Sequence, residues 1–267
     1  MKKLRAKKTL GQHFLKHEPT LNSIVKISQV DSSATVLEIG GGMGDLSKLL
    51  ASLCSKLIVV ETDEDMLPYL NIALEEYNNV HVLHEDILKL NLYELLENEK
   101  PLQVVANLPY YLTTEIMERL FLLSMPIKSI SVMVQKEAGE RLCAWEGSKQ
   151  RGPISLIASI RSESVQKILV TRDKFTPPPS VDSVFLHFSM RHEPLVSYSE
   201  LNNIMRFFNM AFSMRRKTLV NNLGSIADKK LLAETLVSLN IKPNARAEEL
   251  STEQFIVLAE KLNITEN

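Results

Sequence analysis

The sequence predicts an α/β fold, in which a mostly parallel sheet covered by helices is followed by a small all-α domain. From Ser32 to Phe188, short β-branched apolar runs alternate with helix-periodic segments, which is the pattern of a parallel sheet with helices packed on it. After Pro194 the strand signals stop, and the chain becomes charged, Leu-rich and helix-periodic through Lys261. We therefore expect two domains, residues 1–192 and residues 193–267.

The elements follow in order along the chain. About seven segments have strand composition: Thr35–Ile39, Leu57–Glu61, Val80–Leu83, Gln103–Ala106, Ser129–Val134, Val165–Val170 and Val184–Phe188. Helical patterns separate the early strands at Leu46–Leu53, Met66–Glu75 and Thr114–Leu123. In the second domain, Ser251 stands three residues before Gln254 and ahead of an apolar run, which predicts a helix that begins with a capping box.

Composition limits the class of protein. With 267 residues, 45% of them apolar and 24% charged, the chain has ordinary globular proportions and enough length for a sizeable core. The N-terminal residues lack the apolar core of a secretory signal, and no later stretch approaches a membrane span, so we expect a cytoplasmic protein without membrane contact. Cys54 and Cys143 lie far apart with no metal-binding spacing, so no metal site is expected.

Positive charge is concentrated at two places, although the net charge is −1. Residues 1–17 contain no acid and carry the cations Lys2, Lys3, Arg5, Lys7, Lys8 and Lys16. A second cluster, Arg215-Arg216-Lys217, lies near the other end. Such clusters are typical of nucleic-acid contacts, but on charge alone a solvated basic tail explains them equally well.

A glycine-rich turn follows the first predicted strand, with Gly40, Gly42 and Gly44 leading into a helix. Glycines at this place let the backbone approach a ligand closely. The spacing differs from the G-x-G-x-x-G of dinucleotide dehydrogenases, because Asp45 occupies the position of the third glycine. Read with Glu38, the pattern E-x-G-x-G-x-G resembles motif I of the Rossmann-like methyltransferases that bind S-adenosylmethionine. An ordinary tight strand-to-helix turn is the alternative.

Two carboxylates come after the next strands. Glu61 ends the second strand, where an acid can accept hydrogen bonds from both ribose hydroxyls of an adenosine. Asp86 follows the third strand. By resemblance to the Rossmann-like methyltransferases, a carboxylate at this place would accept a hydrogen bond from the adenine amino group of the cofactor. Asp63 and Asp65 are expected to face solvent at a helix start.

The fourth strand ends in Asn107-Leu108-Pro109-Tyr110, which resembles the [DNS]-[LP]-P-[YF] motif of amino-methyltransferases in the form typical of ribosomal RNA adenine N6 dimethyltransferases. The Asn107 side-chain oxygen and the Leu108 carbonyl could each accept a hydrogen bond from an adenine N6 amine, whose lone pair is otherwise delocalised into the ring. Pro109 would fix the turn, and Tyr110 would stack on a flipped-out base.

A second aromatic residue is expected to close the other face of that base. Phe175 opens the segment F-T-P-P-P-S-V-D-S, which resembles the F-x-P-x-P-x-V-x-S segment of the same family. The alternative is a rigid proline loop beside a core phenylalanine.

Two more segments extend the resemblance over residues 7–223. Lys7 to Leu15 is similar to the K-x-x-x-G-Q-[NH]-F-L segment that lies over the cofactor, with His13 where many members have Asn. Residues 211–223 resemble the F-x-x-R-R-K-x-L-x-N-x-L helix of the bacterial 16S rRNA dimethyltransferases, so the cation cluster is expected on a helix. The chain is identified as a member of that family, whose fold is a Rossmann-like seven-stranded methyltransferase sheet.

The resemblance implies a function and a set of residue roles. The reaction would be S-adenosylmethionine-dependent dimethylation of N6 of two adjacent adenosines in a hairpin loop near the 3′ end of 16S rRNA, in the 30S subunit or its precursor. The resemblance also implies residue roles. The residues expected to bind the cofactor are His13, Leu15, Gly40, Glu61, Asp86 and Asn107, and those expected to handle the target base are Asn107, Leu108, Pro109, Tyr110 and Phe175. The residues expected to contact RNA are Lys7, Lys8, Arg215, Arg216 and Lys217. We expect a monomer that acts in small-subunit biogenesis.

Three other functions remain to be tested. A large-subunit rRNA dimethyltransferase would share the catalytic motifs but usually has a more basic C-terminal part. A non-catalytic RNA-binding factor would be expected to lack Asn107 or Tyr110, and both are present. An NAD dehydrogenase is disfavoured by Asp45.

Overall fold

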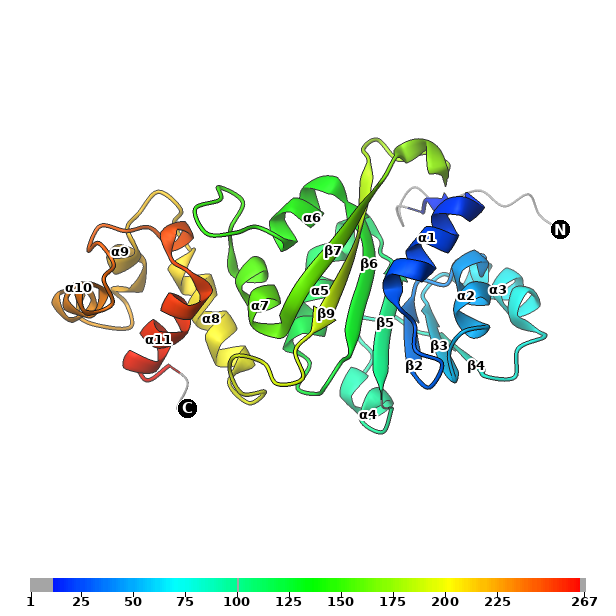
Figure 1. The fold of residues 1–267 in the computed structure, drawn as a ribbon, viewed down its shortest axis with the longest axis horizontal. Helices are drawn as coiled ribbons and strands as arrows, with labels where there is room; N and C mark the ends of the chain where they lie inside the picture. Colours follow the sequence, from blue (N-terminus) through cyan, green and yellow to red (C-terminus); the bar gives the residue numbers. More distant parts are fainter. Residues whose placement is uncertain (1–11, 100, 265–267) are drawn as a thin grey trace. The chain divides into compact units, whose positions relative to one another are not determined.

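The computed structural model describes residues 12–99 and 101–264. In this part of the chain the central feature is a seven-stranded sheet with the strand order β4-β3-β2-β5-β6-β9-β7 (Figure 1). The strands of this sheet are β2 (Thr35–Ile39), β3 (Lys56–Glu61), β4 (Val80–His84), β5 (Leu102–Asn107), β6 (Ser129–Gln135), β7 (Ser162–Val170) and β9 (Ser183–Met190). All seven strands predicted from the sequence are present, with ends that differ by up to three residues.

Five neighbouring strands run parallel, and β9 is inserted antiparallel beside β6. In register, Ile39 of β2 pairs with Val60 of β3 on one side and with Ala106 of β5 on the other. The strand order therefore reverses at β2, and the carboxyl ends of β2, β3, β4 and β5 meet at one edge. In open α/β sheets, ligands bind at such a reversal.

The first strands are buried because helices cover the sheet. All five residues of β2 are buried, which is typical of a parallel strand that is covered on both faces. Helix α1 packs against α2 and against β6 and β9, and α2 packs against β3. Helix bounds are α1 (Glu18–Ser28), α2 (Asp45–Ala51), α3 (Leu67–Leu74), α4 (Leu92–Leu96), α5 (Thr113–Leu122), α6 (Lys136–Leu142) and α7 (Pro153–Arg161). Single 3-10 turns occur at η2 (Glu64–Met66), η3 (Tyr110–Leu112), η4 (Arg172–Lys174) and η5 (Ala247–Glu249).

A second, two-stranded sheet was not predicted from the sequence. Strands β1 (Phe14–Leu15) and β8 (Phe175–Thr176) pair antiparallel, with Phe14 opposite Thr176 and Leu15 opposite Phe175. Each strand is only two residues long, so neither carries a periodic pattern that a sequence argument can use. The pairing joins the N-terminal segment to the proline-rich segment beside the main sheet.

The chain divides into two compact units, and each unit is built from several separate segments of the sequence. Of the described residues, the first unit contains 12–99, 101–119, 125–139 and 163–192. The second contains 120–124, 140–162 and 193–264. The chain passes from the first unit into the second for the last time after residue 192, which is where the sequence places the domain boundary. Helix α7, which comes earlier in the chain, also belongs to the second unit.

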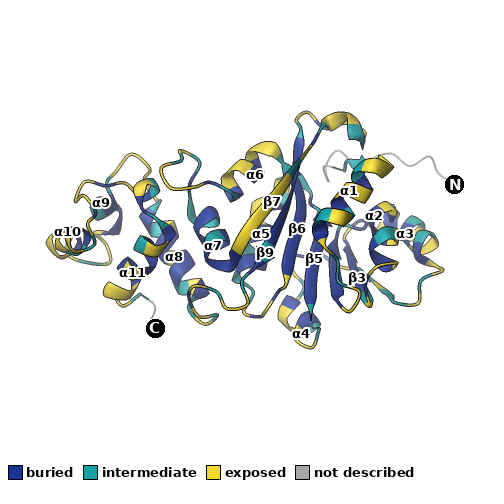
Figure 2. Cartoon of the chain, in the orientation of Figure 1, coloured by how far each residue is buried: buried dark blue, intermediate teal, exposed yellow. Residues whose placement is uncertain are grey.

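The second unit has an aromatic core. Its later helices are α8 (Leu201–Ala211), α9 (Leu219–Leu223), α10 (Lys229–Ser238) and α11 (Thr252–Lys261). Phe207, Phe208 and Phe255 are fully buried, and the rings of Phe208 and Phe255 meet edge to face with centroids 5.4 Å apart. Figure 2 shows buried positions on the inner faces of α8 and α11. The capping box is confirmed, since Ser251 Oγ accepts from Gln254 N at 3.1 Å and Ser251 N donates to Gln254 Oε1 at 2.9 Å.

The cation cluster Arg215-Arg216-Lys217 lies in a turn between α8 and α9, so the predicted helix is wrong at these residues. Helix α8 ends at Ala211, and the buried Asn222 amide donates to the carbonyls of Ala211 and Met214 at 2.5 and 3.3 Å. These carbonyls are thereby satisfied without further helical turns. In the described part of the chain, no helix has the length and apolarity needed to cross a bilayer.

Candidate functional site

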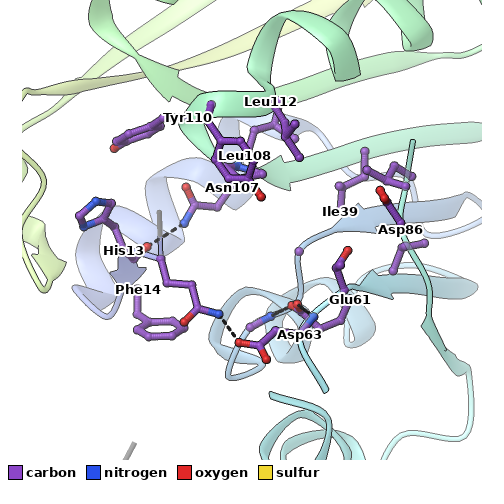
Figure 3. A pocket seen from close by; sticks show the side chains of 18 residues that line it. His13, Phe14, Ile39, Glu61, Asp63, Asp86, Asn107, Leu108, Tyr110 and Leu112 are labelled. Atoms are coloured by element: carbon purple, nitrogen blue, oxygen red, sulfur yellow. Dashed lines mark hydrogen bonds between the residues drawn. The ribbon is translucent and has the colours of Figure 1, made fainter. Parts of the chain in front are cut away.

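The carboxyl edge of the sheet forms a pocket in the first unit (Figure 3). Gly40, Glu61, Asp86 and Asn107 follow or end four neighbouring parallel strands, and all four line this pocket. Residues from the N-terminal segment and from the turn after β5 complete the lining, with apolar contributions from Ile39, Val60, Ile87 and Leu112. The structure thus brings together residues that the sequence places at the carboxyl ends of separate parallel strands.

The glycine turn is shaped by positive φ angles. Gly40, Gly42 and Gly44 have φ of 79°, 55° and 83°, which side chains other than glycine rarely adopt. A Cβ at Gly42 would lie 3.5 Å from the Phe14 ring, so the N-terminal segment approaches this turn closely. The turn leaves its backbone open to a ligand in the pocket.

Glu61 is held by two backbone donors. Its Oε2 accepts from Gly42 N and its Oε1 accepts from Asp63 N, each at 2.8 Å. The residue is 7% exposed, so these bonds compensate the burial of a carboxylate. Each oxygen keeps a second lone pair. A fixed carboxylate of this kind can accept two hydroxyl hydrogens from one ligand.

Asp86 is placed by the turn after β4. Its Oδ1 accepts from Leu88 N at 3.0 Å, and Lys89 Nζ lies 3.7 Å from its Oδ2. The buried Ile87 and the end of β2 at Ile39 supply apolar walls nearby (Figure 3). An acceptor beside apolar walls suits a planar heterocycle that carries an amino group.

The turn after β5 orients Asn107 and Tyr110. Asn107 Nδ2 donates to the carbonyl of His13 at 3.2 Å, which leaves Oδ1 as the acceptor that the side chain presents. Leu108 N donates to Met133 O at 3.2 Å, and the φ of Pro109 is −63°. Tyr110 shares a hydrogen bond of 2.6 Å with Ser183 Oγ, and burial raises the pKa of this phenol.

His13 is the ring nearest to Tyr110 in this site. Their centroids are 5.7 Å apart with an interplanar angle of 26° (Figure 3). His13 Nδ1 lies 2.8 Å from the carbonyl of Pro177, which can only accept, so Nδ1 carries the hydrogen. In the neutral ring Nε2 is then an acceptor, so only the protonated ring can donate from Nε2 to a carboxylate.

The N-terminal segment also contributes residues that the sequence did not single out. Gln12 Nε2 donates to Asp63 Oδ2 at 2.6 Å, and Gln12 and Phe14 line the pocket. The expectation that Asp63 faces solvent is wrong, because it is 4% exposed and lines the pocket, whereas Asp65 is exposed as expected. Asp63 does begin a 3-10 turn, where its Oδ1 accepts from Asp65 N. Its partner Gln12 is 51 residues away, so local sequence gives no signal of the contact.

The sequence profile of the family described as "Ribosomal RNA adenine dimethylase" matches residues 3–263. The chain belongs to this family. It is 39% identical to ribosomal RNA small subunit methyltransferase A of Staphylococcus aureus (strain JH9) over 264 residues, which cover 96% of this chain and 89% of the relative. The protein is therefore an rRNA methyltransferase of the adenine dimethylase family.

Solved structures show the same fold. A dimethyladenosine transferase from Plasmodium falciparum superposes with a TM-score of 0.81 at 24% identity, covering 95% of this chain and 98% of that one. The 23S rRNA methyltransferase ErmE superposes with a TM-score of 0.72 at 21% identity, covering 94% and 99%. The seven-stranded sheet is thus the methyltransferase sheet that the sequence motifs predict.

Two predicted site residues of this rRNA adenine dimethylase are buried in the apolar core. Phe175 is 3% exposed and Leu15 is 6% exposed, and both belong to one hydrophobic cluster that includes Phe185. Leu15 lines a smaller hollow beside the glycine turn, but Phe175 does not line the pocket described above. Stacking of Phe175 on the target base therefore stays a prediction, and the ring that faces Tyr110 here is His13.

Glu38 of the glycine-turn motif is buried, with 1% of its surface exposed, beside the smaller hollow. Burial raises the pKa of Glu38 to about 8, the nearby hydroxyl of Ser47 opposes this shift, and the charge of Glu61 adds to it. Its Oε2 has no hydrogen-bond partner among the described residues. The neutral acid is therefore the favoured form at neutral pH.

The predicted RNA-contacting cations differ in their surroundings. Lys7 and Lys8 lie outside the described residues. Arg215 Nη2 donates to the carbonyls of Lys149 and Arg151 at 2.7 and 2.9 Å, so this guanidinium already has a structural role. Arg216 and Lys217 are exposed. The sequence could not separate these roles, because the partner carbonyls of Arg215 are more than 60 residues away.

Proposed function

We propose that the protein uses S-adenosylmethionine to dimethylate N6 of two adjacent adenosines in a hairpin loop near the 3′ end of 16S rRNA, in the 30S subunit or its precursor. The observation that carries this proposal is the position of Asn107-Leu108-Pro109-Tyr110 at the carboxyl end of β5, in the same pocket as Glu61 and Asp86. A monomeric cytoplasmic enzyme is consistent with this role.

The pocket fits the cofactor by the chemistry of its donors and acceptors. Glu61 is a fixed acceptor for two ribose hydroxyls, and Asp86 beside Ile87 is an acceptor for an adenine amino group. The glycine turn at Gly40 to Gly42 gives the open backbone that close approach requires. The bound cofactor supplies a methyl group on a sulfonium that an amine can attack.

Asn107 prepares the amine for that attack. Because its Nδ2 is committed to the His13 carbonyl, its Oδ1 is the atom available to accept an N6 hydrogen. A second hydrogen bond, from the other N6 hydrogen to the Leu108 carbonyl, would draw N6 toward tetrahedral geometry and localise its lone pair. A strong base is then unnecessary before attack, and the proton leaves after the N–C bond forms.

Tyr110 holds the target base by stacking, while its hydroxyl is tied to Ser183. The His13 ring lies beside Tyr110, with centroids 5.7 Å apart and 26° between the ring planes, so a base stacked on Tyr110 would lie within reach of His13. His13 thereby acts on the base side of the pocket, while its backbone carbonyl positions Asn107.

The choice of the small subunit as substrate rests on the similarity to the S. aureus relative, which is a small subunit methyltransferase. The decisive test incubates the protein and labelled S-adenosylmethionine with 30S particles that lack the modification, and then analyses digested RNA for N6,N6-dimethyladenosine. Parallel reactions contain unmodified 50S particles and, as a catalytic control, the Asn107→Ala variant. We expect dimethyladenosine from 30S particles only, and none with the variant. Product from 50S particles alone would support a large-subunit enzyme instead.

A further inference from the structure

Trp145 is the most exposed of the large apolar side chains in the described part of the chain. It is 74% exposed, whereas Leu169 and Tyr111 follow at 59% and 58%. It lies in the loop between α6 and α7, which Figure 1 draws in green, and it is the single tryptophan of the sequence. An indole kept in water forgoes a large apolar burial, and exposed Trp is enriched at binding surfaces.

The loop that carries Trp145 is held in place by hydrogen bonds within the second unit. Arg215 donates to the carbonyls of Lys149 and Arg151, and Gly147 N donates to Glu248 O at 2.8 Å. Ser148 N also donates to the carbonyl of Trp145 at 3.1 Å, which closes a turn. The indole is therefore presented from an ordered loop, so little conformational entropy would be lost when a ligand stacks on it.

The same hydrogen bonds bring cations beside this loop. Because Arg215 contacts Lys149 and Arg151, the turn that carries the exposed Arg216 and Lys217 adjoins the Trp145 loop. Lys149 is also exposed, and Glu146 is the acid next to the indole in the sequence. With Arg215, four exposed cations adjoin this loop, against Glu146 and the two further acids that the loop contacts, Glu140 through Gln150 and Glu248 through Gly147, so positive charge is in slight excess. An aromatic platform flanked by cations is the arrangement that binds single-stranded nucleic acid.

We propose that Trp145 is a stacking platform for an unpaired base of ribosomal RNA, with Lys149, Arg216 and Lys217 contacting the flanking phosphates. The inference rests on the proposed function only for the identity of the RNA. It places an RNA contact in the second unit, whereas the target-base residue Tyr110 belongs to the first. Its occupant is RNA because exposed cations adjoin the loop that presents the apolar side chain, and a polyanion with exposed bases complements that combination.

The first experiment uses the fluorescence of Trp145, which reports on this position alone because the chain has no other tryptophan. Intact protein is titrated with a synthetic RNA hairpin that has an adenosine-rich single-stranded loop, and in parallel with a fully paired duplex of the same length. Stacking predicts saturable quenching by the hairpin, weak quenching by the duplex, and lower accessibility of the indole to iodide in the complex. Unchanged emission and iodide accessibility at saturating hairpin would overturn the proposal.

The second experiment compares variants for binding to protein-free 16S rRNA and to 30S particles. Trp145→Ala should weaken binding about 5- to 150-fold, the range measured for loss of one stacked base, and Trp145→Phe should restore most of it. The matched control is Tyr93→Ala on α4, which removes an aromatic that is 50% exposed in the first unit and should leave affinity unchanged. The Trp145→Ala variant should keep its melting temperature and S-adenosylmethionine affinity, since the indole is exposed.

Salt dependence separates stacking from charge. Trp145→Ala should leave the slope of log affinity against log salt unchanged, whereas replacing Arg216 and Lys217 together with Ala should reduce it by about 1.4–1.8. Native affinity of Trp145→Ala for both rRNA and 30S particles would refute the stacking role even if dimethylation is normal. Loss of affinity for 30S particles but not for protein-free rRNA would identify a protein partner and also refute it. If the hairpin quenches Trp145 but 30S particles are not dimethylated, the RNA surface stands and the proposed substrate fails.

Discussion

Substitution of Glu38 by Gln tests the charge state of the site. The carboxyl group is buried at the end of β2, and its pKa of about 8 lies above the ordinary value of 4.5. In the unfolded chain the group ionises near pH 4.5, but in the folded protein it keeps its proton until about pH 8. The stability that it contributes is therefore complete below pH 4.5 and is lost as the pH rises toward 8.

The size of the effect follows from the pKa difference. Each pKa unit corresponds to about 1.4 kcal/mol, so the window from 4.5 to 8 corresponds to a loss of about 5 kcal/mol from this one group. Glutamine has the same shape and does not ionise, so the variant lacks this loss. Its amide adds N–H donors in a buried position, which should cost about 1–3 kcal/mol at every pH.

The assay is urea unfolding followed by circular dichroism at pH 5, 6, 7 and 8. We expect Glu38→Gln to be less stable than the wild type at pH 5, and the difference to shrink by about 1.4 kcal/mol per pH unit until the order reverses. The control is Glu75→Gln, which changes an exposed glutamate at the end of α3 and should leave the pH dependence unaltered. Parallel curves for the wild type and Glu38→Gln would show that Glu38 is ionised in the folded protein and would refute the argument.

Four further substitutions test the pocket. Glu61→Ala removes the acceptor proposed for the cofactor ribose, and calorimetry should show S-adenosylmethionine binding weakened by about 1–3 kcal/mol; unchanged affinity would contradict the assignment. Asn107→Ala should lower the single-turnover methylation rate more than it lowers RNA affinity, while Tyr110→Ala should weaken productive capture of the base; near-native rates in both would exclude their roles. His13→Asn removes the ring opposite Tyr110, and should raise the KM for RNA with little change in cofactor affinity, whereas the reverse pattern would place His13 on the cofactor side.

The strands, and the site residues that stand at their carboxyl ends, could be predicted from the sequence. Buried β-branched runs need no distant partner to be recognised, and Gly40, Glu61 and Asn107 stand at the ends of three such runs. Because parallel strands share one carboxyl edge, their placement in one pocket followed from strand assignment alone. The motifs at these ends also indicated the family, to which the chain belongs.

Contacts between residues far apart in the sequence decided which side chains are buried and which line the pocket. Phe175 is buried where β8 pairs with β1, and Asp63 is buried and accepts from Gln12, whereas the sequence predicted that Phe175 faces the target base and that Asp63 faces solvent. The ends of α8 and α9 place Arg215 in a turn, where it supports the loop that presents Trp145. Sequence determines local conformation through backbone propensity and apolar periodicity. Burial and hydrogen-bond partners belong to residues tens of positions apart, so only the tertiary structure could decide which polar groups face the pocket and which aromatic side chain remains in water.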